Sequence, residues 1–226
     1  MKPKKTIASL QLVTHPVEGN SPFNQAESAL QGGCKWIQLR MKNQELESFI
    51  SEGRKIMMLK ELYDFQLIIN DHPKVAMRLQ ADGVHLGKQD MTPSKARRIL
   101  GDDFIIGGTA NSEDDIMRLV GEGVDYIGLG PFRFTSTKEN LSPVIGLGGY
   151  QRLMDWMKQN ELTIPMVGIG GVGLGDVDPL LQTGLQGLAV SSAITKAESI
   201  TSKTKLFLRK IQKTQQNDKR TTFKIR

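Results

Sequence analysis

The sequence predicts a single-domain α/β protein with a (β/α)8 (TIM) barrel fold. Eight short apolar segments follow one another along the 226 residues, and segments with helical periodicity lie between them. Strands that alternate with helices through short connections are typical of a parallel sheet. Eight repeats within about 200 residues favour a closed barrel over an open sheet. No linker composition divides the chain, so we expect one domain.

The predicted strands are short and rich in Val, Ile and Leu, as parallel strands buried on both faces should be. In chain order they lie near Leu12, Gln38, Ile68, His85, Ile106, Ile127, Val167 and Ala189. Helical periodicity is clearest in residues 44–63, 112–123 and 150–161. Thr92 and Pro93 are expected as the N-cap and first residue of a further helix, and acids after Ser112 suit a helix N-terminus.

The formal charge of +6 is concentrated at the C-terminal end, where the segment from Lys203 onward is strongly basic. We therefore expect a barrel over residues 1–200 and a basic helix or tail extension over 201–226. The extension is interpreted as a solvated last helix. An RNA- or membrane-binding arm is the alternative, although no aromatic interleaving or recognisable nucleic-acid motif supports it.

Cysteine content and hydropathy predict a soluble cytoplasmic protein. Cys34 is the single cysteine, which excludes an internal disulfide framework, and we expect a buried, inert thiol. The apolar run after the basic N-terminus contains polar residues and no small-residue cleavage site follows it. No segment approaches the roughly 20 apolar residues of a membrane span.

Polar and charged residues follow most of the predicted strands, at the end of a barrel where active sites lie. Asp71 and Asp90 follow adjacent strands, and all-oxygen ligands of this kind suit Mg²⁺. Arg40, Lys42 and Lys138 supply cations that can bind phosphate. Together they predict a site for a polyphosphate and its metal, with charge stabilisation for a departing pyrophosphate.

A second anion site is predicted after the last two strands. Gly170, Gly171 and Gly173 offer bare backbone N–H groups, and Ser191 and Ser192 begin an expected helix. The sequence offers no obvious Ser-His-Asp set, cysteine nucleophile or Schiff-base lysine. Group transfer with pyrophosphate as leaving group fits this inventory better than acyl transfer or an aldol reaction.

Structural roles are the alternative for several of these residues. Asp71 could cap the helix that follows it, and Asp90 could cap a turn. A histidine inside an apolar strand, as at His85, is more often a hydrogen-bonded core residue than a catalyst.

Several segments taken together resemble the thiamine-phosphate synthase (thiamine-phosphate pyrophosphorylase) family. They are QLRMK, IINDHPKVAMRLQADGVHLGKQD, GVDYIGLGPFRFTSTKENLSP, MVGIGGV and GLAVSSAI, in the order found in the family, and the resemblance runs from about Ile7 to Ala197. It implies a (β/α)8 barrel that joins hydroxymethylpyrimidine diphosphate to hydroxyethylthiazole phosphate. The products would be thiamine phosphate and pyrophosphate, formed by a dissociative, Mg²⁺-dependent mechanism through a carbocation.

The resemblance also implies roles for individual residues. The pyrimidine diphosphate would be held by Gln38, Leu39, Arg40, Met41, Lys42, Asn70, Thr109 and Lys138. Among these, Arg40, Lys42, Thr109 and Lys138 would be catalytic. Asp71 and Asp90 would bind one Mg²⁺ per subunit. The thiazole phosphate would be held by Thr135, Ser136, Thr137, Gly171, Ser191 and Ser192.

The sequence departs from the family pattern at a few positions. Thr109 stands where serine is usual, Lys88 stands where glutamine is usual and adds a cation beside the metal site, and Arg133 makes the loop over 132–146 more basic. This loop is a candidate lid. A thiazole tautomerase-like paralogue and a non-catalytic phosphate-ligand or RNA-binding barrel are the alternative functions. We expect phosphorylated small molecules as partners, with no membrane or nucleic acid; a homo-oligomer stays open.

Overall fold

Eight parallel strands close into a barrel in the protein's structure, which is a computed structural model. The structure describes residues 6–42, 44–134 and 142–224, and it describes side chains as far as Asn217. The strands are β1 (Leu10–Val13), β2 (Trp36–Leu39), β3 (Gln66–Asn70), β4 (Gly83–Leu86), β5 (Ile105–Ala110), β6 (Tyr126–Leu129), β7 (Met166–Ile169) and β8 (Gly187–Val190). Each pairs with its neighbour in the sequence, and β1 pairs with β8 through Leu10 and Leu188 to close the ring. The predicted barrel and all eight predicted strands are confirmed.

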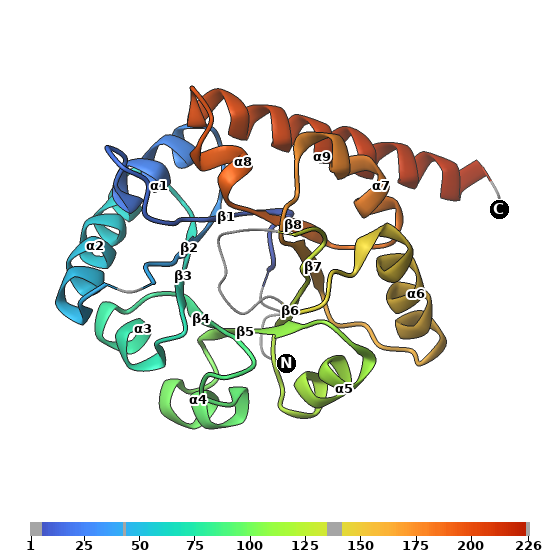
Figure 1. Ribbon diagram of the computed structural model, residues 1–226, viewed down its shortest axis with the longest axis horizontal. Helices are drawn as coiled ribbons and strands as arrows, with labels where there is room; N and C mark the ends of the chain where they lie inside the picture. The colour runs from blue at the N-terminus through green and yellow to red at the C-terminus, as the bar shows by residue number, and fades with distance from the viewer. Residues whose placement is uncertain (1–5, 43, 135–141, 225–226) are drawn as a thin grey trace.

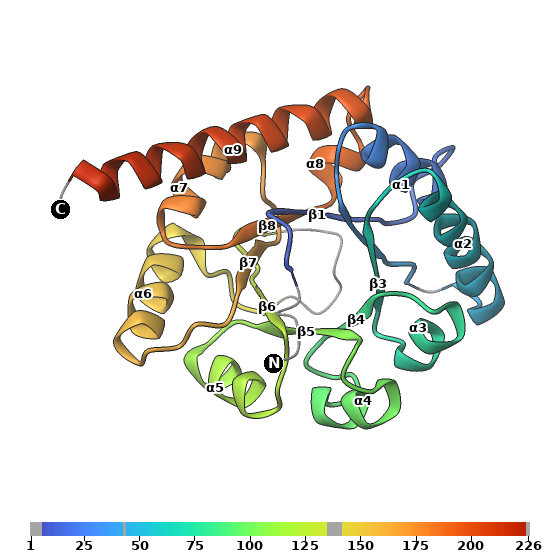
Figure 2. The same cartoon turned by 180° about the vertical axis from the view of Figure 1, so that it is seen from behind.

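Helices surround the strands in both views of the molecule (Figures 1 and 2). They are α1 (Pro22–Gln31), α2 (Leu46–Met58), α3 (Pro73–Leu79), α4 (Pro93–Leu100), α5 (Glu113–Gly121), α6 (Gly146–Gln159), α7 (Val177–Gln182), α8 (Ser192–Thr195) and α9 (Ile200–Lys224). The helix predicted over 44–63 is divided into α2 and the 3-10 turn Leu59–Glu61. The Ser112 hydroxyl accepts from the Asp115 N–H and caps α5. Thr92 occupies the N-cap of α4 as predicted, without a side-chain capping bond.

The core has two apolar layers, one inside the barrel and one between strands and helices. Val13, Trp36, Ile68, Tyr126 and Val167 belong to the inner layer, and the rings of Trp36 and Tyr126 pack in a T-shaped arrangement with centroids 4.9 Å apart. The outer layer is larger and contains the side chains of the strands that point toward the helices. Because successive side chains in a strand point to opposite faces, this arrangement leaves alternate positions at each strand's end facing the barrel mouth.

The last barrel helix is α9, not α8. The segment α8 is a single turn after β8, and α9 then runs along the outside of the barrel between α1 and α7 (Figure 1). Phe207 and Ile211 of α9 are buried, and a Cβ added at Gly32, just after α1, would lie 2.7 Å from Thr204 Cβ. The expected basic extension therefore begins with a helix that packs on the barrel, while Lys205, Arg209 and Lys213 lie on its exposed side.

Two further expectations concern the whole chain. Within the described ranges, no helix is long and apolar enough to cross a membrane. The Cys34 thiol is buried as expected, and burial raises its pKa to about 11, which keeps it protonated and unreactive at neutral pH.

Candidate active site

A cavity of about 280 Å³ lies at the carboxyl ends of the strands, where barrels carry their active sites. Most of the residues predicted to bind substrate or metal contribute to its wall. They are Gln38, Arg40, Lys42, Asn70, Asp71, Asp90, Thr109, Gly171, Ser191 and Ser192. The barrel thus brings together side chains that are up to 154 positions apart in the sequence (192 − 38).

The remaining predicted residues lie elsewhere. Leu39 is fully buried in the outer apolar layer, and Met41 packs against the same layer, so these two side chains support β2 and do not form the cavity wall. Thr135, Ser136, Thr137 and Lys138 lie outside the described residues, as does most of the candidate lid.

Two carboxyl groups meet at one side of the cavity. Asp71 directly follows β3 and has a φ of 65°, a left-handed backbone conformation that Asp tolerates better than most residues. Its N–H donates to the His85 carbonyl oxygen at 2.9 Å, which holds the turn against β4. Asp90 lies in the loop after β4, and its Oδ2 accepts from the Gly87 N–H at 2.7 Å. Asp90 therefore does cap a turn, as the alternative interpretation expected. Asp71 does not cap α3, because the N-cap of that helix is His72.

The electrostatics of this pair fit a divalent cation. Burial, a hydrogen bond with Asp90 and the charge of Asp90 raise the pKa of Asp71 to about 7, against the opposing effect of Lys42 and Arg40. Two half-buried carboxyl groups in contact are unfavourable when both are ionised, and a cation between them removes that cost. Mg²⁺ is commonly held by one or two carboxylates together with substrate phosphates, so a pair suffices. No larger cluster of three or more His, Cys, Asp or Glu occurs among the described residues.

Cations line the cavity next to the acid pair. Arg40 and Lys42 follow β2, and the Arg40 N–H donates to Thr14 Oγ1 at 3.0 Å, which ties the ends of β1 and β2 together. Lys88 also lines the cavity, but its ammonium group lies 2.5 Å from Asp115 Oδ2 on α5. The expectation that Lys88 adds a cation to the metal site is therefore corrected: its charge is neutralised in an ion pair that joins the loop after β4 to α5.

A chain of buried hydrogen bonds crosses the barrel beneath the cavity. Gln38 Nε2 donates to Gln11 Oε1 at 3.0 Å, and Gln11 Nε2 donates to the Tyr126 hydroxyl at 3.5 Å. Tyr126 Oη lies 3.0 Å from His85 Nδ1, and His85 Nε2 lies 3.0 Å from Thr109 Oγ1. The chain therefore links two cavity residues, Gln38 on β2 and Thr109 on β5, through three side chains in the barrel interior.

The direction of this chain follows from its donors. Burial raises the pKa of Tyr126, so its hydroxyl stays protonated. Because the Tyr126 oxygen accepts from Gln11, its single hydrogen is available for His85 Nδ1, and a neutral His85 then carries its proton on Nε2. In this tautomer His85 donates to Thr109 Oγ1, and the Thr109 hydroxyl hydrogen is left for a ligand. His85 is thus a hydrogen-bonded core residue, as expected, and at the same time part of the cavity wall.

The wall opposite the acid pair is a glycine turn after β7. Gly170 and Gly171 have φ values of 94° and 70°, which favour glycine strongly. A Cβ added at Gly171 would lie 2.9 Å from Arg133 Cβ, so the turn packs directly against the segment after β6. Arg133 in turn forms two hydrogen bonds with Asp176, at 2.6 and 2.7 Å, and Asp176 accepts from the Gly173 N–H. The basic residue noted at Arg133 is therefore part of an ion pair that joins these two segments.

Comparison with known proteins identifies the family of the chain. The family described as thiamine monophosphate synthase matches residues 10–194 of the chain. The chain belongs to that family. The thiamine-phosphate synthase of Bacteroides thetaiotaomicron is 44% identical over 202 residues, covering 89% of this chain and 97% of the relative. That of Flavobacterium johnsoniae is 49% identical over 185 residues, covering 80% of this chain and 87% of the relative. These relatives are transferases.

A solved structure of the thiamine-phosphate synthase family has the same fold. The thiamine phosphate pyrophosphorylase from Pyrococcus furiosus superposes with a TM-score of 0.81 at 29% sequence identity, covering 91% of this chain and 96% of that one. The family resemblance inferred from the sequence is therefore confirmed. The likeness also supports an enzyme that acts on small phosphorylated substrates.

Residues that sequence reasoning missed lie in the interior of this thiamine-phosphate synthase family barrel. Gln11 and Tyr126 belong to the buried hydrogen-bond chain, and His15 lies behind Ser191. One signal was present in the sequence: Gln11 is a polar residue inside the apolar strand LQLV. Its partner Tyr126 is 115 positions away, and a single sequence gives no indication of that pairing.

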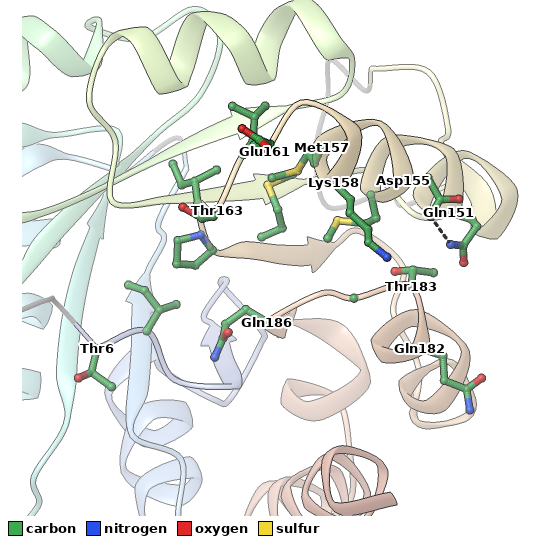
Figure 3. A pocket seen from close by; sticks show the side chains of 17 residues that line it. Thr6, Gln151, Asp155, Met157, Lys158, Glu161, Thr163, Gln182, Thr183 and Gln186 are labelled. Atoms are coloured by element: carbon green, nitrogen blue, oxygen red, sulfur yellow. Dashed lines mark hydrogen bonds between the residues drawn. The ribbon is translucent and has the colours of Figure 1, made fainter. Parts of the chain in front are cut away.

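A second cavity, of about 890 Å³, lies at the opposite end of the barrel, where β7 and β8 begin (Figure 3). Its charged residues Asp155, Lys158 and Glu161 come from α6 and the turn after it. Asp155 accepts from Gln151 Nε2 at 3.1 Å on the same helix (Figure 3). Active sites of barrel enzymes lie at the carboxyl ends of the strands, so the smaller cavity at that end is the candidate active site despite its size.

Proposed function

We propose that this enzyme joins hydroxymethylpyrimidine diphosphate to hydroxyethylthiazole phosphate, giving thiamine phosphate and pyrophosphate. The observation that supports this most is the two-sided cavity. One side has an acid pair beside Arg40 and Lys42, and the other side has a glycine turn beside Ser191 and Ser192. These two sides suit a diphosphate with its metal and a monophosphate, respectively.

The diphosphate end of the pyrimidine substrate would bind on the acidic side. Asp71 and Asp90 would hold Mg²⁺, which when bound supplies positive charge to the departing diphosphate. Arg40 can bind phosphate oxygens through two parallel N–H groups, while Lys42 acts as a point charge. Lys138 is proposed to add a further cation. These side chains would stabilise the negative charge that develops on the leaving group.

The pyrimidine ring would lie over the mouth of the buried hydrogen-bond chain. Asn70 and Gln38 supply side-chain amides there, and the chain through His85 leaves the Thr109 hydroxyl hydrogen free to donate. The chain fixes these groups before the substrate arrives, and groups fixed in advance lose less entropy on binding.

The mechanism we propose is dissociative. The bond between the pyrimidine methylene carbon and the diphosphate oxygen breaks first, and its electron pair leaves with pyrophosphate. The electron-rich aminopyrimidine stabilises the methylene cation, and the thiazole nitrogen then donates its lone pair to form the new C–N bond. No enzymic nucleophile is needed for these steps. The single cysteine, Cys34, is in any case no candidate nucleophile, because it is buried away from the cavity and its pKa is raised.

The thiazole phosphate would bind at the glycine turn and at the end of β8. The Gly171 N–H and the hydroxyl groups of Ser191 and Ser192 are the donors proposed for its oxygens. Thr135, Ser136 and Thr137 are proposed to contact the same phosphate. This arrangement would hold the thiazole nitrogen near the methylene carbon while the phosphate stays at the far side of the cavity.

The alternative functions are less well supported. A thiazole tautomerase needs no diphosphate or metal, yet Arg40, Lys42, Asp71 and Asp90 all line this cavity. An RNA-binding barrel would rely on α9, whose described side chains, as far as Asn217, offer exposed charge as support and nothing more specific.

The direct test of the proposed reaction is identification of its product. Purified protein is mixed with hydroxymethylpyrimidine diphosphate, thiazole phosphate and Mg²⁺, and the mixture is oxidised and separated to detect fluorescent thiochrome phosphate. We expect thiamine phosphate as the product. Hydroxyethylthiazole without its phosphate is the matched control, and we expect it to be a much poorer substrate. Equal use of both would contradict the proposed phosphate site at Ser191.

A further inference from the structure

His15 is a buried polar residue to which the proposed mechanism gives no role. It lies just beyond β1, with 8% of its surface exposed. Gln25 of α1, itself fully buried, fixes its peptide group from both sides: the His15 N–H donates to Gln25 Oε1 at 3.2 Å, and Gln25 Nε2 donates to the His15 carbonyl at 2.8 Å. Because the backbone is held in this way, the imidazole ring projects from a fixed point.

The ring contacts the segment that follows β8. His15 Nδ1 lies 2.9 Å from Ser191 Oγ and 3.3 Å from Thr195 Oγ1. Its other nitrogen, Nε2, is buried and has no hydrogen-bond partner among the described residues. Ser191 lines the candidate active site, whereas His15 lies behind it.

The two ring nitrogens of His15 differ in whether an N–H on them would find a hydrogen-bond acceptor. Burial, with a smaller effect of Lys196 and Arg40, lowers the pKa of His15, so the ring is neutral and carries one N–H. A buried N–H without an acceptor is rarer and more costly than an unpaired acceptor. The proton therefore belongs on Nδ1, next to the two hydroxyl oxygens, and Nε2 keeps a lone pair.

We propose that His15 is a positioning residue for the thiazole phosphate: it donates from Nδ1 to Ser191 Oγ and directs the Ser191 hydroxyl hydrogen toward a phosphoryl oxygen in the cavity. With the opposite tautomer, the Ser191 hydrogen would point at Nδ1 and would be lost to the ligand. This inference rests on the proposed function, in which Ser191 contacts the thiazole phosphate. Thr195 provides a second oxygen that holds the same ring orientation.

Steady-state kinetics with a matched pair of variants tests this role. His15→Leu removes the donor, whereas His15→Asn shortens the side chain but keeps an N–H near the position of Nδ1. We expect His15→Leu to raise the KM for thiazole phosphate about five- to tenfold, as for one lost hydrogen bond to an anion site. We expect the KM for the pyrimidine diphosphate to stay within about twofold, and His15→Asn to restore most of the affinity.

The double variant with Ser191→Ala separates positioning from packing. If His15 acts only through Ser191, adding His15→Leu to Ser191→Ala raises the KM for thiazole phosphate no further. A packing role predicts instead that the effects add, or that both substrates are affected equally. Either of these results would overturn the proposal.

Nuclear magnetic resonance of the wild-type protein gives a test that needs no activity. The chain has three histidines, so long-range ¹H–¹⁵N correlations of ¹⁵N-histidine-labelled protein are few, and the His15 signals are assigned by their absence in His15→Asn. We expect the proton on Nδ1 at neutral pH. A proton on Nε2 would overturn the inference, whatever the reaction. An inactive wild type with the Nδ1 proton present would contradict the proposed function alone.

Discussion

Asp71, at the end of β3, and Asp90, in the loop after β4, lie together in the wall of one cavity, and burial together with the neighbouring Asp90 carboxyl group raises the pKa of Asp71 to about 7. The fold holds the two acids together through separate devices. Asp71 adopts a left-handed backbone conformation and is bonded to the His85 carbonyl, while Asp90 is fixed by the Gly87 N–H. The backbone thus holds two carboxylates close together although they repel each other when ionised. A cation site requires such an arrangement.

Binding of Mg²⁺ to this pair should stabilise the folded protein. We expect saturating Mg²⁺ to raise the Tm of the wild type at pH 8 by about 4 °C relative to protein in EDTA, because the ion binds only the folded state. Asp71→Asn removes a ligand charge and should abolish the increase. The measurement is a thermal melt followed by circular dichroism. Asp64→Asn, an exposed site, is the control and should respond like the wild type.

The buried hydrogen-bond chain should contribute to the stability of the fold. Tyr126→Phe leaves the ring in place but removes the hydroxyl that joins Gln11 to His85. We expect a loss of about 1–3 kcal/mol in the free energy of unfolding, because buried polar partners are left unpaired. Urea denaturation measures this loss. A variant as stable as the wild type would show that the chain is not a stabilising element.

The ion pair between Arg133 and Asp176 should make stability depend on pH in a defined direction. Burial alone would raise the pKa of Asp176, but the hydrogen bond from Arg133 and the Gly173 N–H lower it below its usual value. A lowered carboxyl pKa stabilises the fold above the unfolded pKa of about 3.9, and this stabilisation disappears as the pH falls through the folded pKa.

Comparison of wild type with Asp176→Asn isolates that contribution. We expect the wild type to be more stable at pH 7, and the difference in the free energy of unfolding to shrink toward zero below about pH 4. The Arg133 side chain is 56% exposed, so the difference at pH 7 should stay near or below about 1 kcal/mol. A difference that is constant from pH 7 to pH 3 would mean that charge is not its origin.

Helix α9 should be required for folding through its buried face. Phe207→Ala removes a fully buried ring that packs toward the barrel, and we expect a loss of about 3–5 kcal/mol in the free energy of unfolding. Leu206→Ala is the matched control, because Leu206 is 45% exposed on the same helix turn and should cost little. Equal losses from both variants would contradict the packing described for α9.

Features that depend on neighbouring residues in the sequence were predicted better than contacts between residues that are far apart. Strands such as QLIIN are predicted correctly because a short Val- and Ile-rich run is itself the signal for a buried parallel strand. The positions of Asp71 and Asp90 follow from the barrel topology, which places strand ends on one rim. The pairing of Lys88 with Asp115 does not follow, because it depends on the exact direction of two flexible side chains.

Long-range contacts between side chains were the least predictable part of the site. The contact of His15 with Ser191 spans 176 positions, and the contact of His85 with Tyr126 spans 41. The packing of α9 was also not predicted, because a solvated last helix was expected and only its contacts with α1 and α7 show that it, and not α8, completes the barrel.

The most direct test of the account is pyrophosphate release by wild type and by Asp71→Asn, measured with each substrate and Mg²⁺ omitted in turn. We expect wild-type release that requires both substrates and Mg²⁺, and at least a hundredfold slower release from folded Asp71→Asn, which corresponds to about 2.7 kcal/mol. Release without Mg²⁺, or an Asp71→Asn variant as active as the wild type, would contradict the claim that the acid pair holds the metal that binds the diphosphate.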